Sequence, residues 1–124
     1  MISRHNEYFH RLQTAMINWE DFQKIDIRAG TIVRVAEFPE ALKPALKLWV
    51  DLGALGVKTS SAQITTRYTA QTLIGKQCVC VVNLKPKRIA GFSSELLVTG
   101  FADENNEVIL CTPDKRVPNG AVLF

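Results

Sequence analysis

The sequence has few cysteines and histidines, and they form no pattern typical of a metal site or a disulfide framework. The three cysteines, Cys78, Cys80 and Cys111, make an odd count without a CxxC pair, and His5 and His10 lie far from them. Cys78 and Cys80 are two residues apart in a strand-like run, so both side chains face one side. We expect them to be small core residues, and we expect neither a metal nor a cofactor.

Long apolar runs are also absent. No segment approaches the roughly 20 apolar residues that span a bilayer. The first residues, MISRHNEYFHRLQTAMI, lack the uninterrupted apolar stretch and the small-residue cleavage site of a secretory signal. These absences predict a cytoplasmic protein without membrane insertion.

Catalytic motifs are missing as well. The chain contains no GxSxG and no HExxH. LIGKQ resembles a phosphate loop, but Ala70 and Gln77 replace its first glycine and its Ser/Thr, and a strand follows instead of a helix. We therefore predict a protein that is not an enzyme. The enzyme alternative would require a bound metal or cofactor.

Charge is distributed unevenly along the chain, although the formal net charge is only +3. Residues 41–90 carry eight Lys or Arg against the single acid Asp51, whereas 91–114 carry five acids and no cation. A concentrated basic face is the usual footprint of a polyanion-binding site. The alternative is that these cations are dispersed over a solvated surface.

The length of 124 residues suits one compact domain. Residues 1–17 are expected to be an N-terminal extension, with helical spacing at Phe9, Leu12 and Met16. The domain is expected over 18–124, beginning with a short helix in WEDFQKI after Asn18, a residue that favours helix N-termini.

From Ile27 onward, strand patterns dominate. The expected strands are IRAGTIVRVAEF, ALKLWVDL, VKTSSAQI, KQCVCVVNL, IAGFSSELLVTGF and EVILCT, with a short helix or turn in TTRYTAQTLIG. In ALKLWVDL the aliphatic residues share one face, while Lys47, Trp49 and Asp51 share the other. Many short strands with one helical interruption favour an all-β, five-stranded Greek-key barrel of the OB type with short helices. An SH3-like barrel or a small sandwich stays open on periodicity alone.

A basic cluster, KPKR, connects two expected strands. Pro86 restricts how far Lys85, Lys87 and Arg88 can scatter, so they can neutralise phosphates at lower entropic cost than a flexible lysine run. Arg67 beside Tyr68 suits a phosphate with a stacked base, although Tyr68 also has the spacing of a core residue. Lys43, Lys47 and Lys58 extend this basic patch if their strands share a face.

Ser94 and Glu95 follow the basic cluster on the next expected strand. A carboxylate repels phosphate but accepts hydrogen bonds from base amino groups, so Glu95 can read an unpaired base. A salt bridge to Lys87 or Arg88 is the alternative.

Trp49, Phe92 and Phe38 are aromatic candidates for a separate contact. Each suits a stacked base, an apolar peptide segment or a second subunit. We assign them to a peptide-binding surface or a dimer seam.

The order of motifs resembles the tRNA-binding domain family, and within it the CsaA secretion chaperones. The resemblance covers about Trp19 to Phe124 and rests on DIRAGTI, NLKPKRIAGFSSE and PDKRVPNG. At two places the chain departs from the general family: Leu96-Leu97 stand in place of Gly-Met, and Ala62-Gln63-Ile64 in place of Ser-Gly-Ile. Both changes resemble the CsaA branch.

This resemblance implies an OB-fold homodimer without catalytic activity. It implies RNA contacts for the basic residues and the Ser-Glu motif, which correspond here to Lys85, Lys87, Arg88, Ser94 and Glu95. It further implies binding of unfolded precursor proteins and of the SecA translocation ATPase. We therefore predict a CsaA-like chaperone with RNA-binding capacity, and the alternative is a structure-specific, stand-alone tRNA-binding protein that assists translation.

Overall fold

The computed structural model describes residues 15–124, so most of the helical extension predicted over 1–17 lies outside the described part of the chain, and Met16 within it is not helical. The elements follow in the order α2 (Trp19–Gln23), β1 (Ile27–Glu37), β2 (Leu46–Asp51), the 3-10 helix η1 (Gly53–Leu55), β3 (Val57–Ala62), α3 (Ala70–Leu73), β4 (Gln77–Val81), β5 (Lys87–Ile89), β6 (Phe92–Ser94), β7 (Leu97–Val98), β8 (Gly100–Ala102) and β9 (Val108–Leu110). Among these described residues, no helix is long and apolar enough to cross a membrane.

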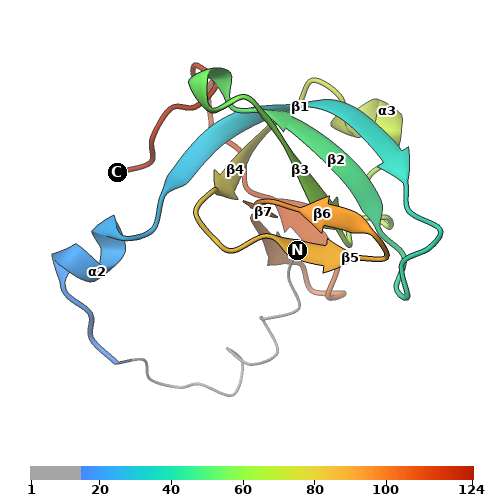
Figure 1. Ribbon diagram of the computed structural model, residues 1–124, viewed down its shortest axis with the longest axis horizontal. Coiled ribbons are helices and arrows are strands. Elements are labelled where there is room, and N and C mark those ends of the chain that lie inside the picture. Colours follow the sequence, from blue (N-terminus) through green and yellow to red (C-terminus); the bar gives the residue numbers. More distant parts are fainter. Residues whose placement is uncertain (1–14) are drawn as a thin grey trace.

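Five strands form one antiparallel sheet in the order β3-β2-β1-β4-β7. The sheet curls into a nearly closed barrel, with the β5–β6 hairpin beside it and α2 and the C-terminus at one end (Figure 1). Two further two-stranded sheets pair β5 with β6 and β8 with β9. The predicted all-β barrel with short helices is confirmed.

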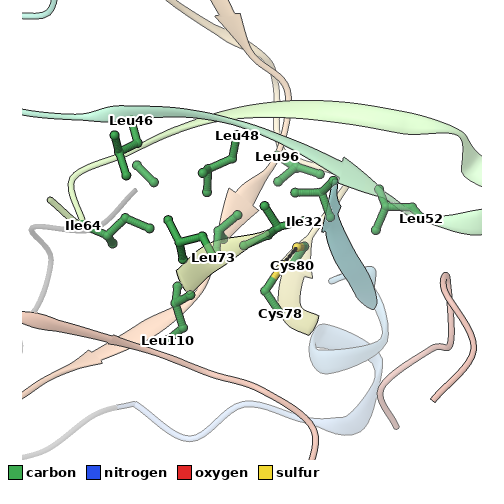
Figure 2. Packing of buried hydrophobic residues seen from close by; sticks show 13 residues of the cluster. Ile32, Leu46, Leu48, Leu52, Ile64, Leu73, Cys78, Cys80, Leu96 and Leu110 are labelled. Carbon is green, nitrogen blue, oxygen red and sulfur yellow. Dashed lines mark hydrogen bonds between the residues drawn. The ribbon is translucent and has the colours of Figure 1, made fainter. Parts of the chain in front are cut away.

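The core follows from strand alternation. In β2, Leu46, Leu48 and Val50 are buried, while Lys47 and Trp49 point outward and are half-buried. Buried aliphatic residues of β1, β2 and α3 meet Cys78 and Cys80 of β4 inside the barrel (Figure 2). The face assignment predicted for this strand is therefore correct.

Gly30 lets β1 approach β2 closely. A Cβ at this position would lie 2.5 Å from Val50 Cγ1 and 2.8 Å from a Leu52 methyl carbon. A few residues later, a register shift between Ile32 and Arg34 interrupts the pairing of β1 with β2. Such a bulge bends the strand and changes which side chains face outward.

The two cysteines of β4 face the core, as expected. Cys78 and Cys80 are both fully buried with their sulfurs 3.5 Å apart (Figure 2). The hydrogen bond with Cys78, and then burial, raise the pKa of the Cys80 thiol above its ordinary value. The Cys80 thiol therefore stays neutral, and both side chains pack in the core.

The segment 85–101 differs most from its prediction. Lys87 and Arg88 were expected in a connection, but they lie in β5 and pair with Ser94 and Ser93 of β6. The single strand expected over 89–101 is instead a hairpin arm followed by the separate strands β7 and β8. The reason is the two-residue turn Ala90-Gly91, both with positive φ, which reverses the chain.

The loop PDKRVPNG packs across the end of the barrel. The side-chain amide of Gln77 donates to Val117 O (2.8 Å) and accepts from Val117 N (3.0 Å), and Thr31 Oγ1 donates to Asn119 Oδ1 (2.6 Å). Gly120 has a φ of 88°, and a Cβ there would lie 2.5 Å from Leu52 O. This motif thus ties the C-terminal segment to β1 and β4.

Candidate nucleic-acid and polypeptide interface

The basic hairpin, here defined as residues 85–94, carries the KPKR cations on and just before its first strand. Lys85, Lys87 and Arg88 are exposed. Arg88 Nη2 donates to Gly91 O at 2.7 Å and so braces the turn of its own hairpin. Within residues 15–124 the two lysines have no ion-pair partner, so their charge is available to a ligand.

Ser94 and Glu95 join this hairpin to the barrel. Thr59 N and Thr59 Oγ1 donate to Glu95 Oε1 at 3.1 and 2.8 Å, and Ser61 N donates to Ser94 Oγ at 3.0 Å. Side-chain oxygens therefore replace part of a backbone ladder along the free edge of β3. The alternative salt bridge from Glu95 to Lys87 or Arg88 does not occur in the described residues.

Arg67 and Tyr68 point to different partners. Arg67 pairs with Asp103 in the turn between β8 and β9, at 3.0 Å. Backbone hydrogen bonds, chiefly from Glu107 N, together with Arg67 hold the pKa of the Asp103 carboxyl below its ordinary value. Tyr68 packs against the core, and its hydroxyl accepts from Leu110 N at 3.1 Å. The expected phosphate-and-base fork is thus not preformed here.

Lys58 lies on β3, next to the Thr59 that binds Glu95, and its side chain is half-buried. This position is close in sequence to the joint between hairpin and barrel. The role in RNA binding stays a prediction for Lys58, for Arg67 and for the residues of the basic hairpin.

The three aromatic candidates meet on the outer face of the barrel. Phe92 forms edge contacts with Phe38 and Trp49, with ring centroids 5.5 and 5.8 Å apart. Lys47 Nζ lies over the Phe38 and Phe92 rings at 4.8 and 5.3 Å, and Arg34 lies over Trp49 at 4.3 Å. Phe38 itself is only 3% exposed. The assignment of this cluster to a peptide-binding surface or a dimer seam stays a prediction.

Arg34 did not emerge from sequence reasoning. The bulge in β1 exposes Val33 and Arg34 in succession, so alternation along the strand does not predict which face Arg34 occupies. Arg34 lies directly opposite Trp49 on the neighbouring strand, and this position could be predicted only if the register of β1 and β2 were known.

A groove of about 600 Å³ opens between α3 and the loop that follows β1. Its apolar wall includes Val35, Phe38, Pro44 and Leu46, and α3 contributes Ala70. This hollow was not predicted, because its walls come from separate segments within 35–46 and 65–71 that only the fold brings together. Its lining also includes the polar residues Glu37, Thr65, Thr69 and Gln71.

Exposed apolar side chains gather at the opposite end, around α2 and the C-terminus, which lie on the same side of the barrel in Figure 1. Trp19 and Ile25 are 60% and 46% exposed, and Leu123 and Phe124 are 44% and 100% exposed. Together they border a shallow hollow of about 490 Å³. This end patch has the character of a protein-binding surface.

No group of three or more His, Cys, Asp or Glu suited to a metal ion occurs within the described range 15–124. The geometry offers cations, stacked rings and apolar hollows.

A family model described as "Putative tRNA binding domain" matches residues 27–122. The chain belongs to the tRNA-binding domain family. The crystal structure of chaperone CsaA from Bacillus anthracis str. Ames superposes with a TM-score of 0.84 at 51% identity, covering 89% of this chain and 100% of that one. CsaA from Picrophilus torridus gives 0.82 at 47% identity, with 88% and 100% covered. These neighbours have the OB fold, which confirms the predicted fold class.

Curated relatives include methionine–tRNA ligases. That of Methanococcus aeolicus is 38% identical over 108 residues, which are 87% of this chain and 16% of the enzyme. That of Flavobacterium johnsoniae is 33% identical over 111 residues, 90% of this chain and 15% of the enzyme. The chain thus spans about a sixth of the length of these relatives, and the similarity concerns their tRNA-binding part.

Proposed function

We propose that this protein is a non-enzymatic chaperone of the CsaA type, which binds unfolded precursor proteins in the cytoplasm before their secretion. The observation that carries the proposal is the groove between α3 and the loop after β1. The likeness to the CsaA structure supports it, because the two chains are 51% identical and the match covers all of the CsaA chain. In the proposed role, precursor proteins and the SecA ATPase are partners.

The groove suits an extended apolar segment. Burial of apolar side chains contributes roughly 25 cal/mol per Å², from which the cost of ordering the segment must be subtracted. The apolar part of the wall contacts a ligand without fixing its orientation, so the affinity is expected to be modest and the range of ligands broad. Such binding suits a protein that must hold many different clients.

A homodimer is part of this proposal, and the end patch is its best seam. Trp19, Ile25, Leu123 and Phe124 expose more apolar surface than the packed cluster of Trp49, Phe92 and Phe38. Burial of this patch against a second copy would remove it from water. The grooves and basic hairpins would then stay accessible on both copies.

The test of the chaperone function uses a charge placed in the groove. Ala70→Asp adds a carboxylate at the first residue of α3, where the helix tolerates an acid. We expect it to weaken binding of a reduced, carboxymethylated, permanently unfolded polypeptide by roughly tenfold, because the apolar wall acquires a charge. Fluorescence anisotropy with labelled polypeptide measures the affinity.

Asn105→Asp is the matched control, since it adds the same charge on the exposed turn between β8 and β9. It is expected to bind polypeptide like the wild type. Equal affinities for the wild type and Ala70→Asp would reject the groove as the polypeptide site, and no binding by the wild type would reject the chaperone function.

RNA binding is the second candidate function, favoured by the family and by the unpaired lysines of the basic hairpin. In this form the protein is a structure-specific tRNA-binding protein that assists translation. Phosphate contacts make RNA binding fall steeply with salt, whereas apolar polypeptide binding does not. Titration of folded tRNA and of the unfolded polypeptide at two salt concentrations separates the two functions.

A further inference from the structure

The outer face of β1 and β2 stacks cations on aromatic rings at two adjacent places. Arg34 of β1 is the direct cross-strand partner of Trp49 of β2, and its guanidinium carbon lies 4.3 Å from the indole centroid. Two cross-strand pairs further along, Lys47 lies over Phe38 and Phe92. Trp49 points away from the barrel core, so barrel closure does not require its contact with Arg34.

Arg34 has one face on the indole and is otherwise exposed. It has no carboxylate ion pair within residues 15–124, and neither does Lys47. A guanidinium held flat against a ring loses little further freedom when a second planar group stacks on its open side. Arg34 thus offers both a plane and a positive charge.

Trp49 is held in place by its neighbours. Its ring meets the edge of Phe92, which in turn contacts Phe38, so the indole is fixed from one side and covered by Arg34. An indole on the solvent side of a strand adds little to the core. Its fixed orientation instead suits a stacking platform.

The platform continues into the basic hairpin. Phe92 pairs directly with Ile89 across the turn of the hairpin, next to Lys87 and Arg88 of β5. If a base of a single-stranded RNA stacks on Arg34, the neighbouring phosphates of that RNA can therefore contact the cations of the basic hairpin. Rings interleaved with cations along a groove or face are the usual arrangement for single-stranded nucleic acid.

We propose that Arg34 and Trp49 form a stacking subsite for an unpaired nucleobase of RNA, with the base on the open face of the guanidinium and its flanking phosphates near Lys47 and the basic hairpin. The inference rests on the RNA-binding part of the proposed function and names its ligand as a single-stranded segment. A duplex hides its base faces in the stack, and an acidic peptide would use the charge but not the plane.

Two variants separate the contribution of base stacking from the contributions of side-chain charge and side-chain size. Trp49→Leu keeps an apolar side chain, and Arg34→Lys keeps the charge without the planar guanidinium. The probes are a labelled, unstructured 12-nucleotide RNA and an abasic ribose-phosphate strand of equal length, both measured by anisotropy at one low salt concentration. Phe101→Leu is the matched control, because Phe101 is an exposed aromatic residue on β8, outside both the β1–β2 face and the end patch.

We expect Trp49→Leu to weaken RNA binding roughly tenfold and Arg34→Lys roughly fivefold, with the abasic strand bound as before by both. In the Trp19→Phe protein, where Trp49 is the remaining tryptophan, RNA but not the abasic strand is expected to quench the fluorescence. Thermal unfolding checks that each variant is folded.

Three outcomes would overturn the subsite. Equal losses on both strands would show that the two residues act through charge or folding. Unchanged RNA binding in both variants, with loss in Lys85→Ala/Lys87→Ala, would reject the platform and leave RNA binding in place. A wild type that binds unfolded polypeptide through Trp49 but no RNA would reject both the subsite and the RNA function, while leaving the chaperone function intact.

Discussion

Glu95 shows how one residue changes meaning once its neighbours are known. The sequence places it beside three cations, where a base contact and a salt bridge are the obvious alternatives. In the structure its Oε1 instead accepts two hydrogen bonds from Thr59 on β3. Thr59 is 36 residues away, so no local pattern indicates the contact. Glu95 therefore has a structural role that is independent of any ligand.

Replacing Glu95 tests that role. Glu95→Ala leaves Thr59 N without its acceptor in a part-buried position, and we expect the free energy of unfolding to fall by about 1–3 kcal/mol. Glu95→Gln keeps a side-chain oxygen acceptor and is expected to lose less than half as much. Urea unfolding provides the measurement. An unchanged stability of Glu95→Ala, together with loss of RNA binding, would restore the base-contact role.

At the scale of elements, the basic hairpin is the most informative feature. The sequence predicts the cations and the restriction by Pro86, but it does not reveal that Ala90 and Gly91 form a turn. Ala90 has a φ of 47°, a conformation that favours glycine or asparagine, so the residue type is a poor indicator of the turn. The hairpin is therefore recognised only in the structure, from the pairing of β5 with β6 and from the contacts of Ser94 with β3.

The charge of this hairpin has a measurable signature. Lys85→Ala/Lys87→Ala removes two cations without touching Arg88, which braces the turn. If both lysines contact phosphate, the slope of log K against log salt should become shallower by about 1.4 for single-stranded RNA.

The charge-matched control is Lys24→Ala/Lys115→Ala, which removes two exposed cations outside the hairpin. It should leave the slope near the wild-type value. An equal change of slope in both double variants would mean that net charge, and not the hairpin, determines binding.

At the scale of the whole molecule, the outer surface divides into regions of different chemistry. The groove beside α3 is largely apolar, the hairpin and the face of β1 and β2 are cationic, and the end patch exposes aromatic and aliphatic side chains. A homodimer joined through the end patch would leave the other two surfaces free. Its two copies would also bind one extended ligand at two places, which raises the apparent affinity.

Dimerisation can be tested with one charge in the patch. The wild type is expected to be a dimer at micromolar concentration by light scattering, and Leu123→Asp a monomer, because burying a carboxylate in an apolar seam is costly. Leu42→Asp is the control, since Leu42 is fully exposed on the loop after β1. A monomeric wild type, or a dimer that tolerates Leu123→Asp, would contradict this seam.

The sequence by itself determined the strand alternation, the burial of Cys78 and Cys80, the helix start at Asn18 and the family, because these depend on local periodicity, capping and the order of motifs. Only the tertiary structure decided that Glu95 binds Thr59, that Arg34 stacks on Trp49 and that a groove opens beside α3. Each of these depends on strand register or on segments distant in the chain. The bulge in β1 and the turn at Ala90 set that register, and neither has a distinct pattern in the sequence.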